Sequence, residues 1–285
     1  MRNNSRIATA VAVPLSALAT LVGALALAVI IPNIAHAAAV PGHYLYNFNV
    51  AGVLNEAGSN ETSTSKYWWV NSGAKLIIGN GTGKTVQGNL PANDYWRLLY
   101  ARTNPLDTDN GYHPQNIFRL ISKQSWGAAT HEMAFRINKL NNSSSPNRDG
   151  HNGVLFFARY QDGNNLYYAG VRSDGAAVLK KKIGGSYYTL AQTQVFGTKG
   201  SYNRTTNPSL LPQNTWVRMK LEAKNNTNGS VSLALLIDKE NDGTFTPAVS
   251  ATDSGTGGAP IKTGRSGIRT DFMDVEFDNF RVRDL

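Results

Sequence analysis

Apolar and polar residues alternate along much of this chain. In the segment 132–140, Met, Phe and Ile occupy every second position from 133 to 137. The same period of two runs through 216–223 and 231–237. Because successive side chains of a strand point to opposite faces, each segment is predicted to be a β-strand with one buried and one solvated face. Helical periodicity is hard to find elsewhere.

Tight turns separate the predicted strands. Asp-Gly pairs begin at Asp149, Asp162, Asp174 and Asp242, and this dipeptide is a strong hairpin signal. Many short strands, glycine-rich turns and little helix predict an all-β fold, a two-sheet antiparallel jelly roll. Neither a repeat nor a clear linker divides residues 38–285, so we expect a single domain.

The first 37 residues have a different composition. Two arginines precede a long apolar run (7–31), and Ala35-His36-Ala37 follows it. This order is typical of a secretory signal peptide with small residues at its cleavage site. Residues 1–37 are therefore predicted to be a signal peptide, and residues 38–285 a secreted, extracellular protein. The apolar run is also long enough to span a bilayer, so an uncleaved anchor is the alternative.

Cysteine count and charge narrow the possible functions. The chain has no cysteine, which excludes disulfides, thiolate metal sites and a cysteine nucleophile. Two of the 28 basic residues lie in the leader, so 26 basic and 19 acidic residues remain, a net charge of +7. An exported basic protein can bind anionic polymers. Since no nucleic-acid-binding motif is present, we expect a monomer with an acidic polysaccharide as partner, and neither nucleic acid nor membrane.

Two stretches carry a family resemblance. The closing segments TWVRMKLEAK, VSLALLIDKENDGTF and SGIRTDFMDVEFDNFRVRDL resemble the end of concanavalin A-like jelly rolls. The segment NLYYAGVRSDGAAVLKKKIGG is similar to the central strands of secreted glucuronan lyases, and more faintly to a strand of jelly-roll alginate lyases. Arg172 stands where the alginate-lyase tyrosine would fall, and the other alginate-lyase strand motifs are absent. The resemblance implies a polysaccharide lyase acting on glucuronan first and alginate second.

The strand pattern itself predicts a basic groove. If the strands around 154–183 are neighbours in one sheet, their outward residues share a face. The predicted substrate-binding residues are Arg136, Arg159, Arg172, Lys180 and Lys182. Tyr168 lies among them, and Tyr188 could close the groove across the next hairpin.

Such a groove suits β-elimination at a uronate link. Cations held against the substrate carboxylate stabilise the charge that develops when the C5 proton leaves. A tyrosine or histidine then takes that proton, and nearby positive charge lowers a tyrosine's pKa. Tyr168 is the first candidate for acid or base, followed by Tyr188, His151 and His131.

Other functions fit parts of the pattern. A lysine run on an edge strand often only prevents edge-to-edge aggregation, and the same face could belong to a non-catalytic, lectin-like carbohydrate-binding module. Asp274, Glu276 and Asp278 lie on one face of the last strand, as the acid pairs of jelly-roll glucanases do. A glucanase is therefore the third hypothesis.

A calcium site is also possible. Asp238, Glu240 and Asp242 place oxygen ligands at alternate positions before Gly243, as calcium loops do. The glutamate expected at the twelfth position is replaced by Val249, and an ordinary Asp-Gly turn explains the same residues. We expect at most a structural Ca²⁺ here and no organic cofactor.

Overall fold

The computed structural model describes residues 42–285. The predicted signal peptide, residues 1–37, lies outside the described residues. Within them, no helix has the length and apolar character needed to cross a membrane. The one α-helix described there, α1 (Tyr95–Thr103), begins after Asp94, whose side chain accepts a hydrogen bond from the Trp96 amide.

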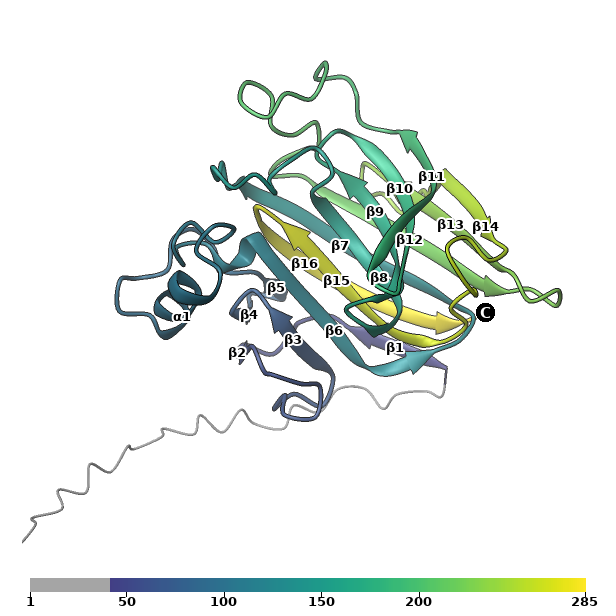
Figure 1. Ribbon diagram of the computed structural model, residues 1–285, viewed down its shortest axis with the longest axis horizontal. Coiled ribbons are helices and arrows are strands. Elements are labelled where there is room, and N and C mark those ends of the chain that lie inside the picture. Colours follow the sequence, from purple (N-terminus) through teal and green to yellow (C-terminus); the bar gives the residue numbers. More distant parts are fainter. Residues whose placement is uncertain (1–41) are drawn as a thin grey trace, which may run out of the picture. The chain divides into compact units, whose positions relative to one another are not determined.

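Two antiparallel β-sheets make up the fold, which confirms the predicted two-sheet jelly roll (Figure 1). The nine-stranded sheet has the order β14–β13–β12–β7–β16–β5–β4–β2, with β1 paired to β16. Its strands are β1 (His43–Tyr46), β2 (Gly52–Asn55), β4 (Lys75–Gly79), β5 (Thr82–Lys84), β7 (Ala129–Leu140), β12 (Trp216–Asn225), β13 (Val231–Asp238), β14 (Thr246–Asp253) and β16 (Met273–Asp284).

The seven-stranded sheet has the order β11–β10–β9–β8–β15–β6–β3. Its strands are β3 (Trp68–Ser72), β6 (Ile117–Trp126), β8 (Gly153–Asp162), β9 (Asn165–Arg172), β10 (Ala176–Ile183), β11 (Ser186–Gln194) and β15 (Gly264–Asp271). A short 3-10 helix, η1 (Pro114–Asn116), leads into β6. Segments predicted as strands from alternation correspond to β7, β12 and β13.

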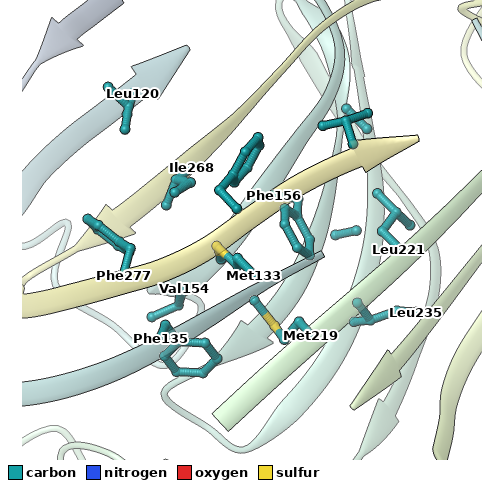
Figure 2. Packing of buried hydrophobic residues seen from close by; sticks show 14 of the residues in the cluster. Leu120, Met133, Phe135, Val154, Phe156, Met219, Leu221, Leu235, Ile268 and Phe277 are labelled. Carbon is teal, nitrogen blue, oxygen red and sulfur yellow. The ribbon is translucent and has the colours of Figure 1, made fainter. Parts of the chain in front are cut away.

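The main hydrophobic core lies between the two sheets. Phe135 and Met219 from the nine-stranded sheet and Phe156 from the other belong to one buried cluster (Figure 2). Each is at most 1% exposed, and burying a side chain of this size stabilises the fold by about 1.5–3 kcal/mol. The inward residues are the apolar members of the period-two pattern, so the opposite residues of the same strands face outward.

A second apolar cluster covers the outer face of the seven-stranded sheet. It contains Trp69, Ile121, Leu155, Phe157, Tyr160, Leu166, Tyr168 and Val178. This sheet is therefore apolar on both faces near its centre, and a cleft lies on its outer face.

Candidate functional site

The cleft lies on the outer face of the seven-stranded sheet and has a volume of about 520 Å³. Its floor comes from β6, β8, β9, β10, β11 and β15, and its walls from the loops around residues 107 and 146–152 and from the β15–β16 turn. The polar and charged lining residues are Asp107, Arg119, Asn147, Asp149, His151, Asn152, Tyr168, Arg172, Lys180, Tyr187, Arg269 and Asp271. We call this site the basic cleft.

Strand pairing explains how distant residues meet there. Tyr168 of β9 is paired with Lys180 of β10 and with Phe157 of β8. Paired residues of adjacent strands have side chains on the same face. Tyr168, Arg172 and Lys180 therefore project from one face, as the sequence pattern predicts, and all three line the basic cleft.

Tyr187 lies in the cleft, whereas Tyr188 lies on the other side of its strand. Tyr187 is paired with Lys182 across the β10–β11 hairpin, and Tyr188 with the inward Lys181. The Tyr188 ring packs against Gly257, where an added Cβ would be 2.3 Å from it. The predicted site residue Tyr188 is thus displaced from the cleft because neighbouring residues of a strand point to opposite faces.

The two cleft tyrosines interact directly. The ring centroids of Tyr168 and Tyr187 are 5.8 Å apart. Burial raises the pKa of Tyr168. Burial acts in the same direction on Tyr187, but hydrogen bonds with Tyr168 and Arg269 and the charges of Arg269 and Lys182 outweigh it and lower the Tyr187 pKa. Tyr187 is 50% exposed and lines the cleft, so its side chain can contact a ligand.

Arg269 interacts with both tyrosines. Its guanidinium carbon is 5.2 Å from the centre of the Tyr168 ring. Its Nε donates to both oxygens of Asp271, at 3.0 and 2.9 Å. Burial alone would lower the pKa of Arg269, but the neighbouring Asp271 carboxylate raises it. Arg269 is therefore a fixed positive charge.

Two further cations stand beside the tyrosines. Arg172 pairs with Asp174 through Nη2 and donates to Gln192 over 3.3 Å. Lys180 lies 5.5 Å from the centre of the Tyr187 ring. Burial, followed by the charge of Arg172, lowers the Lys180 pKa.

Two predicted residues lie at the edges of the cleft. Lys182 is 4.8 Å from the centre of the Tyr187 ring and donates to the Gly163 carbonyl, outside the lining residues. His151 lines the wall, where its Nδ1 is 3.2 Å from Asp149. Its side chain is 65% exposed, and it belongs to the wall loop of the cleft.

Arg159 faces the interior instead of the cleft. Its backbone has a positive φ of 52°, and the β8–β9 register shifts between Ala158 and Asp162. This β-bulge inverts the alternation of side chains. The guanidinium is buried and donates to the carbonyls of Ile261 and Ala223 at 2.8 and 3.0 Å, so the predicted substrate contact is replaced by a bridge between the sheets.

Arg136 also lies away from the cleft. It belongs to β7 in the nine-stranded sheet and forms an ion pair with Glu276. The strands β7 and β8 follow each other along the chain but belong to different sheets. Arg136 and Tyr168 are therefore not neighbours, which makes the predicted position of Arg136 wrong.

The carboxylates proposed for a glucanase lie in that other sheet as well. Glu276 contacts Lys84 at 2.7 Å and Arg136. Burial raises the Glu276 pKa, but its hydrogen bonds with Lys84 and Arg136 outweigh this and lower it. Asp274 is buried and accepts from Gln115, Asn141 and Gly88. These acids, with Asp278, are in β16 and do not line the cleft.

The residues of the proposed calcium loop do not gather as a ligand set. The Asp238 oxygens accept from the amides of Asp242 and Gly243 at 3.2 and 2.8 Å, which is a hairpin-turn arrangement. Glu240 is exposed, and no three acidic or histidine side chains within residues 42–285 are placed to hold a metal. These residues do not fit a Ca²⁺ site, because Asp238 is used by the turn and Glu240 points into solvent.

Eight of the polar and charged lining residues were not predicted as site residues: Asp107, Arg119, Asn147, Asp149, Asn152, Tyr187, Arg269 and Asp271. Arg269 alternates with the buried Ile268 and Thr270, so a period-two reading of its segment could have placed it outward. If residues are paired outward from the Gly184-Gly185 turn, Tyr187 is opposite Lys182. This pairing could have selected Tyr187. Arg119 and Asp107 have no comparable local signal, because only the packing of loops and strands brings them to the cleft.

Comparison with known proteins gives the following similarities. Neither a family model nor a curated protein sequence matches the chain. The carbohydrate-binding module CBM66 from Bacillus subtilis is 13% identical over 76% of this chain and 95% of its own, with a TM-score of 0.47. The Bacillus licheniformis β-glucanase is 12% identical over 85% of this chain and 97% of its own, with a TM-score of 0.42.

A third similar structure is the GH43 protein BlXynB from Bacillus licheniformis. It is 11% identical over 85% of this chain and 39% of its own, with a TM-score of 0.44. None of these three is a glucuronan lyase. Identities and TM-scores this low do not transfer the ligand or activity of those proteins to this chain.

Proposed function

We propose that this protein binds a uronate-rich polysaccharide in the basic cleft and cleaves it by β-elimination, with glucuronan as the first substrate and alginate as the second. The observation that carries the proposal is Tyr187, a half-exposed tyrosine whose pKa is lowered by Tyr168 and Arg269. A lowered pKa makes a tyrosine a more effective general base, because a larger fraction of it is ionised at a given pH. We also propose that the mature chain is exported.

The residues of the cleft divide the reaction between them. Arg172, Lys180 and Arg269 bind the substrate carboxylate and stabilise the negative charge that develops next to it. The ionised Tyr187 takes the C5 proton, a C4–C5 double bond forms, and the C4–O4 bond breaks. The proton then passes from Tyr187 to the leaving O4. Tyr168 donates a hydrogen bond that stabilises the phenolate.

A non-catalytic binding module is the second candidate. The pairs Arg172–Asp174 and Arg269–Asp271 neutralise part of the positive charge, as suits a surface that holds a polymer without transforming it. Exposed Tyr187 beside two lysines would serve such a surface equally well.

One assay separates these functions. The mature protein is incubated with glucuronan, alginate and a neutral β-glucan, while absorbance near 235 nm and reducing ends are both measured. Rising absorbance on a uronate polymer is expected. Reducing ends without absorbance would indicate a hydrolase, and binding without either signal would indicate the binding module.

The tyrosine pair gives the first specific prediction. Tyr187→Phe keeps the ring but removes the proton-transfer group, so turnover should fall by about 10²–10⁴-fold while polymer binding persists. Parent activity should increase with pH below the usual tyrosine pKa of about 10, because Tyr187 ionises more easily than an isolated tyrosine. Tyr188→Phe is the matched control and should retain activity. Full activity of Tyr187→Phe on every polymer that the parent cleaves would refute the assignment.

A further inference from the structure

A second hollow lies beside the basic cleft. Its volume is about 630 Å³, and its lining residues are Asn89, Pro105, Leu106, Asp109, Asn110, Tyr112, His113 and Ser144. We call it the Tyr112 pocket. Its lining contains no lysine or arginine, in contrast to the basic cleft.

One loop separates the two hollows. Ser144 lines the Tyr112 pocket, whereas Pro146 and Asn147 line the basic cleft. The Oγ of Ser145 donates to Asp107 at 2.6 Å, and the Oγ of Ser143 donates to Asp109 at 2.5 Å. These bonds fix the loop on the segment after α1, and the two hollows therefore share this loop as a common wall.

The pocket pairs an apolar surface with polar groups in fixed positions. Leu106 and Tyr112 are 54% and 37% exposed, and the Arg97 guanidinium lies 3.7 Å from the centre of the Tyr112 ring. The His113 ring is held between Asp109 at 2.8 Å and Asn89 at 2.6 Å. An exposed aromatic ring with nearby amide and carboxylate groups suits a sugar ring, which has an apolar face and a rim of hydroxyls.

Charge decides which sugar fits. Asp109 places a carboxylate in the wall, so a uronate carboxylate turned into the pocket would meet a like charge. We propose that the Tyr112 pocket is a subsite for a neutral sugar residue of the polysaccharide whose uronate residue occupies the basic cleft. The inference rests on the proposed function only for the uronate residue in the basic cleft. Glucuronan and alginate contain uronate residues alone, so a polymer that fills both hollows would be a mixed polysaccharide with neutral as well as acidic residues.

The test uses neutral ligands, so that it does not depend on the lyase activity. Binding of cellohexaose, xylohexaose and laminarihexaose is measured by calorimetry and by NMR of the labelled mature protein. At least one should bind, perturb the amides of Leu106 and Tyr112, and bind equally in high salt because no ionic contact is involved. Tyr112→Ala should weaken this binding by about tenfold, the loss expected when a well-buried apolar contact is removed.

Matched variants separate the possible outcomes. Tyr95→Ala removes another exposed tyrosine, 66% exposed on α1 and outside the pocket, and should leave binding unchanged. If Tyr112→Ala does not fold, Leu106→Ala provides a second test, because it should weaken binding to a similar extent. Arg172→Ala should weaken glucuronan binding without affecting the neutral ligand. The subsite would be overturned if none of the three hexasaccharides bound. It would also be overturned if Tyr112→Ala and Leu106→Ala bound them as tightly as the parent does. Neutral binding in a protein that ignores every uronate polymer would instead refute the proposed function alone.

Discussion

At the scale of single residues, His131 shows how burial decides chemistry. It was a reserve candidate for the catalytic base, yet it is 1% exposed between the sheets, with Nδ1 2.7 Å from the Ser266 hydroxyl. Burial, assisted by the charge of Arg159, lowers its pKa to about 3. His131 is therefore neutral in the folded protein and out of reach of a ligand.

This pKa predicts how stability depends on pH. An unfolded histidine titrates near pH 6.5, so between about pH 6.5 and pH 3 the unfolded state binds a proton that the folded state does not. Stability from neutral His131 is complete above that range and is lost as pH falls through it, at up to about 1.4 kcal/mol per pH unit. Urea unfolding of His131→Gln at several pH values should show a shallower acid decline.

The exposed His151 supplies the control for that experiment. His151→Gln changes a side chain that is 65% exposed and should change the unfolding free energy little at neutral pH. Equal slopes for the parent and His131→Gln would show that His131 is protonated in the folded protein as readily as in the unfolded one.

At the scale of elements, β10 gives three consecutive lysines three environments. Lys180 lines the cleft, and Lys182 lies beside Tyr187. Lys181 points inward, has no exposed side-chain area, and contacts Asp253 at 2.9 Å and the Gly258 carbonyl at 2.7 Å. The Tyr167 hydroxyl donates to the same Asp253, so β9, β10 and the end of β14 are tied together.

Removing the inward lysine should destabilise the protein strongly. Lys181→Met leaves the Asp253 carboxylate buried without its cation, which typically costs about 3–5 kcal/mol. Lys182→Met is the matched control, since its ammonium group is near the surface, and should change the unfolding free energy little. Urea denaturation followed by circular dichroism measures both. Similar midpoints for the two variants would contradict the assigned direction of Lys181.

At the scale of the whole molecule, the positive charge of the cleft should make polymer binding sensitive to salt. The screening length shortens from about 30 Å at 0.01 M to about 3 Å at 1 M salt. Glucuronan affinity should therefore fall across this range, and the fall should be smaller for Arg172→Ala and Lys180→Ala, which should also bind more weakly at low salt. Lys224→Ala, an exposed cation on β12 of the other sheet, is the control. Affinity that does not change with salt would argue against carboxylate binding in the cleft.

The sequence by itself determined the fold class and much of the cleft floor. Alternation is local, so each strand's own residues decide which of its faces is buried, and β7, β12 and β13 were predictable for this reason. Tyr168, Arg172 and Lys180 were assigned to one face because β9 and β10 are joined by a short Asp-Gly turn, which leaves little freedom in their pairing.

Only the tertiary structure decided the rest of the site. Arg136 lies in the other sheet, because the pairing of strands that are distant in sequence decides the neighbours of β7 and chain order does not. Arg159 points inward because a bulge interrupts the alternation of β8, and Tyr187 replaces Tyr188 because the register of a single hairpin selects one of two adjacent rings. Arg269, Arg119 and Asp107 meet the cleft through contacts between segments far apart in sequence. The physical reason is that alternation encodes the side of a strand, whereas hydrogen bonding and packing over the whole domain determine what lies beside it.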